Sequence, residues 1–207
     1  MTPTYVDFAA DSAQRAAMAA VRRHYAGRAA TYAVQTYGCQ MNEHDSEQLS
    51  GLMEDMGLTP AASFQEADIM LLNTCCVREH AEVKVFGNVG ALRRVKAERP
   101  DAVLCVCGCM MQQQAAAHKL QRQYPFVDLI FGTHAVRQFP ELLARTLEGR
   151  RVLEVQDAPG AVVEGLPTRR KAGCLAFVNI MYGCDNFCSY CIVPYVRGRE
   201  KSRPLED

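Results

Sequence analysis

The stretch TYAVQTYGCQMNEHDSEQLSGLMEDMG, residues 31–57, contains one strand–loop–helix unit. Its first part, Tyr32–Tyr37, has the apolar and aromatic content of a strand. Asn42 is then expected to cap a helix, which Gly57 would end. Apolar residues recur at helical spacing between them, at Leu49, Leu52, Met53 and Met56. The stretch therefore predicts a strand followed by a helix that covers it.

The same unit recurs along the chain as far as residue 156. Further strands are expected at Ile69–Leu72, Val103–Cys107, Val127–Phe131 and Val152–Val155. Helices are expected through about Arg94, from Met110 onward and over Phe139–Leu147. Because strands and helices alternate, we predict an α/β domain over residues 31–156, with an open parallel sheet and covering helices.

The remaining segments differ from this pattern. Residues 1–30 are expected to form an N-terminal extension, helical over 8–30 and without chemistry. Residues 157–173 contain Pro, Gly and charges without a periodic apolar face, which is typical of a linker. A second unit starts at 174 with the apolar run Leu175–Met181, but a (β/α) barrel needs roughly 200 residues. We therefore expect this unit to be unfinished and poorly fixed.

Charge and composition narrow the classes of protein. The chain of 207 residues has 23 basic and 23 acidic side chains, so its net charge does not indicate a nucleic-acid partner. Residues 168–203 hold seven basic side chains against two acidic ones, which is either a local basic patch or a set of solvated charges. No export signal or membrane-spanning run is present, so we expect a cytoplasmic protein. Ten cysteines in that reducing compartment indicate metal binding or catalysis.

Three cysteines occupy equivalent places in the repeated unit. Cys39, Cys75 and Cys109 each follow a predicted strand and precede a predicted helix. The carboxyl ends of parallel strands lie along one edge, and a helix N-terminus favours the thiolate. Three such thiolates could ligate a metal centre with one open position. The alternative is that buried cysteines pack as small hydrophobic residues, which suits Cys76, Cys105, Cys107 and Cys174 better.

A second cysteine set lies in the stretch GCDNFCSYC, residues 183–191. Cys184, Cys188 and Cys191 form a Cys-x3-Cys-x2-Cys pattern after an apolar run, which would place three thiolates around one iron–sulfur cluster and leave the fourth iron open. A structural zinc site needs four ligands, and no histidine follows the triplet. Cys174 could be the fourth ligand, so the zinc interpretation stays open.

Four ordered segments together resemble one known family, the radical S-adenosylmethionine methylthiotransferases. They are QTYGCQMNEHDSE (35–47), LNTCCVREHAE (72–82), GCMMQ (108–112) and NIMYGCDNFCSYCIVPYVRGREKSR (179–203). Within the family, the residues around Cys39 and Cys184 are similar to the branch that modifies isopentenylated adenosine in tRNA.

The resemblance implies a set of ligands and cofactors. Cys184, Cys188 and Cys191 match the ligands of the radical 4Fe–4S cluster, whose open iron binds S-adenosylmethionine, and Tyr190 would lie near the adenine of that cofactor. Cys39, Cys75 and Cys109 match the ligands of a second 4Fe–4S cluster, which carries or delivers sulfur. One S-adenosylmethionine would yield the radical and a second the methyl group, and the product would be the 2-methylthio form of N6-isopentenyladenosine beside the anticodon.

The resemblance also implies more chain than is present. Family members continue through the rest of a radical S-adenosylmethionine (β/α) barrel and a small RNA-binding β-barrel, so we expect residues 174–207 to hold only the first strand and cluster loop of the former. We expect a monomer with tRNA as its partner; no motif specifies the sulfur or electron donor. Two alternatives stay open: methylthiolation of another target, such as threonylcarbamoyl-adenosine or a ribosomal protein, and a zinc-binding module without catalysis.

Overall fold

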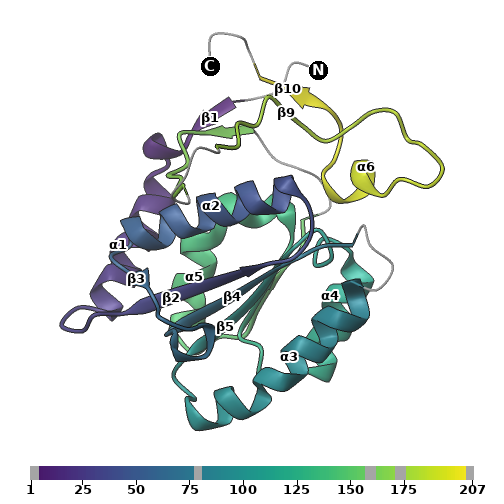
Figure 1. Cartoon of the computed structure of the whole chain (residues 1–207). Coiled ribbons are helices and arrows are strands. Elements are labelled where there is room, and N and C mark those ends of the chain that lie inside the picture. Colours follow the sequence, from purple (N-terminus) through teal and green to yellow (C-terminus); the bar gives the residue numbers. More distant parts are fainter. Residues whose placement is uncertain (1–4, 77–80, 157–161, 171–175, 204–207) are drawn as a thin grey trace.

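A parallel β-sheet organises the protein (Figure 1). The structure is a computed structural model that describes residues 5–76, 81–156, 162–170 and 176–203. Within these ranges six strands form one sheet in the order β3-β2-β4-β5-β6-β7, and every neighbouring pair is parallel. Their bounds are β2 Thr31–Thr36, β3 Thr59–Pro60, β4 Ile69–Thr74, β5 Val103–Gly108, β6 Leu129–Phe131 and β7 Val152–Glu154. The predicted α/β domain with a parallel sheet is confirmed.

Helices cover both faces of this sheet (Figure 1). One face packs against α1 Ser12–His24, α2 Gln40–Asp55 and α5 Phe139–Leu147. The other face packs against α3 Ala81–Glu98 and α4 Gln114–Gln123. Short 3-10 helices lie at Phe8–Ala10, Phe64–Glu66 and Thr133–Gln138. None of the helices in the described ranges has the length and apolar character needed to cross a membrane.

Side-chain alternation in the central strands divides the core into two layers. In β4, Leu71 faces the layer of α1, α2 and α5, whereas Met70 and Leu72 face the layer of α3 and α4. In β5, Cys105 and Cys107 are buried among the residues of the first layer, and burial raises the pKa of both thiols. The prediction that these two cysteines serve packing is therefore confirmed.

Element boundaries differ from the predicted ones at several places. The strands β4 and β5 run one or two residues further than predicted, and α3 extends past Arg94 to Glu98. The predicted helix from Met110 begins only at Gln114, because residues 109–113 form turns, in which the amides of Met111 and Gln112 donate to Gly108 O. The helix Phe139–Leu147 forms as predicted.

The N-terminal helix α1 packs directly on the domain. Met18 and Val21 are buried in the same core layer as α2 and α5, and α1 lies against α5. The short strand β1 Tyr5–Asp7 pairs in parallel with β8 Val162–Glu164, so the predicted linker contributes a strand. The N-terminal segment and the linker are thus tied to each other beside the main sheet (Figure 1).

The secondary structure after residue 175 differs from the prediction. In place of a strand over Leu175–Met181, the described part has β9 Met181–Tyr182, which pairs antiparallel with β10 Lys201–Ser202. Residues 171–175, which include Cys174, lie outside the described residues. Between β9 and β10 the chain forms the cysteine loop and the short helix α6 Val193–Val196. Pro194 and Val196 are buried, whereas Val178, Ile180 and Tyr190 are exposed. The poorly fixed segment and the barrel both stay predictions.

We predict that α1 contributes to the stability of the domain. Changing Val21, which is fully buried, to Ala should lower the free energy of unfolding by about 2 kcal/mol, because two methyl groups leave a packed core. Urea unfolding measures the change. Arg15→Ala on the exposed side of the same helix is the control and should change it by less than about 0.5 kcal/mol. Equal effects of the two variants would show that α1 does not share the core.

Candidate metal centres at the carboxyl edge of the sheet

Cys39, Cys75 and Cys109 follow three neighbouring parallel strands. Cys75 comes directly after β4 and Cys109 directly after β5, and Thr74 is the register partner of Gly108. Cys39 follows β2, whose Thr36 is the partner of Asn73 in β4. The structure thus places all three cysteines at one edge of the sheet, with Cys75 and Cys109 buried and Cys39 exposed.

Asn42 connects the three strand ends. Its side chain is fully buried, and its amide nitrogen donates to Tyr37 O at 2.8 Å and to Thr74 O at 2.9 Å. Its amide oxygen accepts a hydrogen bond from the Cys109 thiol at 3.3 Å, and its backbone carbonyl accepts from Asn73 Nδ2 at 2.8 Å. One side chain therefore fixes the ends of β2 and β4 and the residue that follows β5.

Asn42 is therefore not the helix cap that the sequence predicted. The helix α2 begins at Gln40, with Cys39 at the N-cap position and without a side-chain capping bond. The reason is that the Asn42 amide is used across the strand ends, where its buried polar atoms find partners. Cys109 also differs from the prediction, since four residues, 110–113, separate it from the start of α4 at Gln114.

Gly38 allows the turn after β2 to approach Cys75. It has a φ of +117°, which disfavours any residue with a side chain. A Cβ at this position would lie 2.5 Å from Cys75 Cβ and 2.7 Å from Cys75 Sγ. The backbone that leads into Cys39 is therefore packed directly against the Cys75 side chain.

The thiol of Cys109 has a polar environment that Cys105 and Cys107 lack. A hydrogen bond from Cys76 and the charge and Nε–H of Arg197 together lower the pKa of Cys109 to about 7, although burial opposes this. The hydrogen bond that the Cys76 thiol donates to Cys109, together with burial, raises the pKa of Cys76. Cys76 was predicted to serve packing only, but the structure places it against Cys109. Its position directly after Cys75 in the sequence could have indicated that it lies near the first set.

Arg197 reaches this edge from the far end of the chain. Its Nε donates to Cys109 Sγ at 3.2 Å, and its terminal nitrogen donates to Asn42 Oδ1 at 2.7 Å. The same nitrogen lies 2.7 Å from Asp45 Oδ2, and the two side chains are only 10% and 8% exposed. Burial opposes the charge, but Asp45 and Cys109 outweigh it, so the pKa of Arg197 is raised. Sequence reasoning did not identify this residue.

The second cysteine set lies in a loop that is held beside Arg197. The Cys184 amide donates to Gly198 O at 3.1 Å, and the Cys191 amide donates to Cys188 O at 2.9 Å. Cys188 is exposed and the other two are half-buried. Because Gly198 is adjacent to Arg197, one short segment contacts both Cys184 and Cys109.

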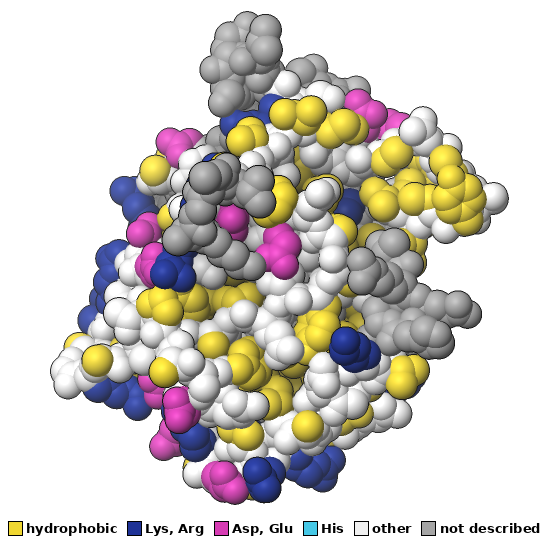
Figure 2. Space-filling model, viewed as in Figure 1, with side chains coloured by type: hydrophobic (Ala, Val, Ile, Leu, Met, Phe, Trp, Pro, Cys, Tyr) yellow, Lys and Arg dark blue, Asp and Glu magenta, His cyan; other side chains and the backbone are white. Residues whose placement is uncertain are grey.

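Apolar side chains surround this loop on the surface. Figure 2 shows hydrophobic atoms gathered over the segment that holds α6. Tyr190 is 90% exposed, and Phe187 packs edge-on against Tyr195 with the guanidinium of Arg199 over its ring. The loop thus presents aromatic faces to solvent.

Four of the six basic side chains that the structure describes after residue 168 lie in ion pairs with acids. Arg169 lies 2.5 Å from Glu54 and Arg170 lies 3.7 Å from Glu47, both acids on α2. With the Asp45–Arg197 pair, three carboxylates of one helix hold three arginines of the later segment. The predicted basic excess is therefore balanced largely within the protein, which weakens the interpretation as a nucleic-acid patch.

The donors of the first set at this edge are thiols, a ligand type that iron–sulfur clusters use. Among the described residues, no three His, Cys, Asp or Glu side chains converge as the ligands of one metal ion. The donor chemistry fits, since three thiols share the edge and one of them accepts an N–H bond of the kind that tunes cluster sulfurs.

Comparisons with known proteins agree with these observations. Residues 31–132 match the model of a family described as "Uncharacterized protein family UPF0004". The chain is 54% identical over 178 residues to a tRNA-2-methylthio-N(6)-dimethylallyladenosine synthase of Clostridium tetani, and 53% identical over 182 residues to one of Alkaliphilus oremlandii. A synthase of that name from Desulforamulus reducens is 55% identical over 177 residues.

The matches cover most of this chain but a smaller share of each relative. They cover 85–87% of this chain but only 39% of the length of each of these three relatives. The resemblance to methylthiotransferases that the cysteine segments indicated is confirmed. The UPF0004 segment contains Cys39, Cys75 and Cys109, whereas the second set lies beyond it.

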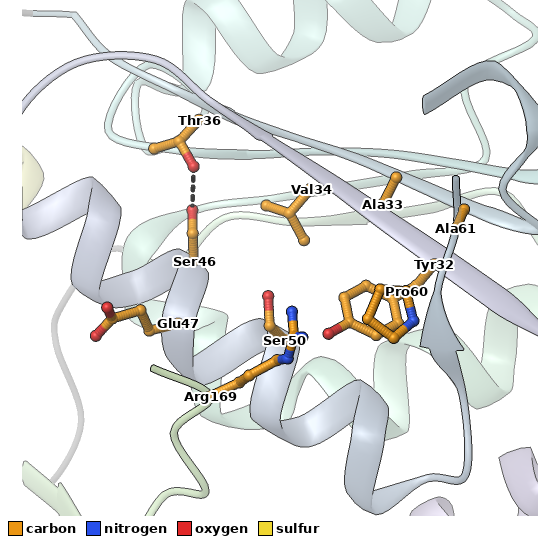
Figure 3. Close-up of a pocket in the computed structure, with 10 residues that line it drawn as sticks. All are labelled: Tyr32, Ala33, Val34, Thr36, Ser46, Glu47, Ser50, Pro60, Ala61 and Arg169. Atoms are coloured by element: carbon orange, nitrogen blue, oxygen red, sulfur yellow. Dashed lines mark hydrogen bonds between the residues drawn. The ribbon is translucent and has the colours of Figure 1, made fainter. Parts of the chain in front are cut away.

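A pocket of about 240 Å³ lies between β2 and α2, apart from the cysteines (Figure 3). Tyr32 and Thr36 come from β2, Ser46 and Ser50 from α2, and Arg169 closes one side. Its polar groups largely bond within the protein: Thr36 donates to Ser46, and the Tyr32 hydroxyl and Arg169 both contact Glu54. The pocket is best explained as the crevice left where residue 169 docks on α2.

We predict that Gly38 is required for the packing of this edge. Gly38→Ala should lower the free energy of unfolding of the metal-free chain by about 3 kcal/mol, because the new Cβ meets Cys75 and the φ is strained. Gly57→Ala is the matched control, since Gly57 has a φ of +89° but open space around it. It should cost only about 1 kcal/mol. Equal losses in urea unfolding would show that the contact with Cys75 is unimportant.

Proposed function

We propose that this chain is part of an enzyme that transfers a methylthio group to an N6-isopentenylated adenosine of tRNA. The observation that carries the proposal is that the Arg197 segment contacts both cysteine triplets. The chain is also 54% identical, over 178 residues, to a synthase of that modification. Radical formation and sulfur insertion must occur close together, and two adjacent three-thiolate sites meet that need.

Cys39, Cys75 and Cys109 would hold one 4Fe–4S cluster, and Cys184, Cys188 and Cys191 a second one with S-adenosylmethionine. When bound, the two clusters supply sulfur at the first site and reductive cleavage of S-adenosylmethionine at the second. The exposed ring of Tyr190, next to Cys191, is available to pack against the adenine of the cofactor.

The chain's own residues would orient these groups. Asn42 fixes the strand ends that carry the first triplet, and Gly38 sets the approach of Cys39 to Cys75. Cys75 and Cys109 are buried, so water is kept from that side of the site, whereas Cys188 is open toward the surface where a tRNA base would enter. The nine cysteines among the described residues form no disulfide, in keeping with a reducing cytoplasm.

Two alternatives make different predictions. A radical enzyme for another target would keep both clusters but act on threonylcarbamoyl-adenosine or a ribosomal protein. A zinc module would bind zinc in place of iron and sulfide, and would need a fourth ligand for the second triplet.

We predict that the two triplets bind iron independently. After anaerobic reconstitution with iron and sulfide, C39A/C75A/C109A and C184A/C188A/C191A should each retain about half of the wild-type iron and sulfide, because each removes one of two clusters. Cys105→Ala is the control for a buried cysteine of the core, and it should keep the full content. Stoichiometric zinc without sulfide would contradict the proposal.

We also predict that the second triplet is needed for cleavage of S-adenosylmethionine, whereas the first is needed only for methylthiolation. In an anaerobic assay of the complete enzyme with S-adenosylmethionine and reductant, Cys188→Ala should abolish 5′-deoxyadenosine formation, whereas Cys75→Ala should preserve it. Both variants should lose the 2-methylthio nucleoside when expressed in cells whose own enzyme is deleted, as measured by mass spectrometry of digested tRNA. Cys76→Ala should keep both products, which would separate it from its neighbour Cys75. Normal methylthiolation by Cys75→Ala would disprove the role of the first triplet.

A further inference from the structure

The backbone around Arg197 is anchored to the domain. The Arg197 amide donates to Val193 O at 2.8 Å and closes α6, and Val196 is 2% exposed. The hydroxyl of Thr133, which follows β6, donates to Val196 O. The cysteine loop is therefore connected to the edge of the sheet through a short and well-packed segment.

Arg197 differs from the other arginines of its segment in burial. Its side chain is 10% exposed, whereas those of Arg169 and Arg170 are both 45% exposed and that of Arg199 is 70% exposed. A buried guanidinium is costly unless its donors and its charge are satisfied. Here Asp45 supplies the charge, and Asn42 and Cys109 accept hydrogen bonds.

The contact with Cys109 has a consequence for any group bound at that sulfur. A charged N–H donor stabilises negative charge on the sulfur, and hydrogen bonds to ligand sulfurs help to set cluster reduction potentials. Reduction adds negative charge to a cluster, so a buried cation at 3.2 Å from the ligand sulfur should favour the reduced form.

We propose that Arg197 is a positioning residue that fastens the radical-cluster loop to the first triplet and raises the reduction potential of the cluster at Cys109. The redox part of this inference rests on the proposed function. The fastening part rests on contacts of the chain alone, since Arg197 links Asp45, Asn42 and Cys109 to the segment that holds Cys184.

The fastening is tested on the metal-free chain by amide hydrogen exchange. In Arg197→Met the amides of Cys184 and Arg197 should exchange about tenfold faster or more, because buried charge-assisted bonds are lost. Arg197→Lys keeps the charge and should be intermediate. Arg94→Met removes an exposed arginine of α3 and should leave both amides unchanged. Unchanged exchange in Arg197→Met would overturn the fastening role.

The redox role is tested in C184A/C188A/C191A protein, where a cluster can form only at the first triplet. An EPR-monitored titration should give a more negative potential for Arg197→Met, a smaller shift for Arg197→Lys and none for Arg94→Met. A potential unchanged in Arg197→Met would overturn this role alone. If the C184A/C188A/C191A protein formed no cluster, the assignment of the first triplet and the redox role would both be overturned. The hydrogen-exchange experiment would still decide the fastening role.

Discussion

The carboxyl edge of the sheet depends on the buried amide of Asn42. Its two N–H groups bond to carbonyls at the ends of β2 and β4, and its oxygen accepts from Cys109 and Arg197. An amide has few geometries that satisfy all of these partners at once, so it fixes the spacing of the strand ends. The positions of the three first-set cysteines follow from that spacing, because each is adjacent to a strand end or to the turn that Gly38 makes against Cys75.

The helix α2 has a second role as the docking surface for the later part of the chain. Asp45, Glu47 and Glu54 point carboxylates to Arg197, Arg170 and Arg169, and the backbone of residue 169 donates to Glu47 O. The two more exposed pairs contribute little each, and the buried Asp45–Arg197 pair contributes specificity, since removing either partner would leave an unpaired buried charge. The basic excess of residues 168–203 is thereby explained in large part by partners within the chain.

Cys105, Cys107 and Cys109 show how position along one strand decides the chemistry of a thiol. The first two lie within β5 among apolar side chains, where burial holds the thiol protonated. Cys109 lies beyond the strand end, where Cys76 and Arg197 lower its pKa. The same residue type thus serves the core at two positions and a candidate ligand site at the third, and the difference arises from the end of the strand at Gly108.

The sequence by itself determined the parallel sheet, its strand-end cysteines and the resemblance that the relatives confirm, because apolar periodicity and ordered motifs are local properties of the chain. It did not determine that Asn42 connects the strand ends, because the local pattern indicated a helix cap at this residue. It also did not determine the contact between Cys76 and Cys109. The pairing of Arg197 with Cys109 and Asn42 joins residues 88 and 155 positions apart. Only the tertiary structure decided these contacts, because they depend on strand order, register and the docking of one segment on another, which no local stretch of residues encodes.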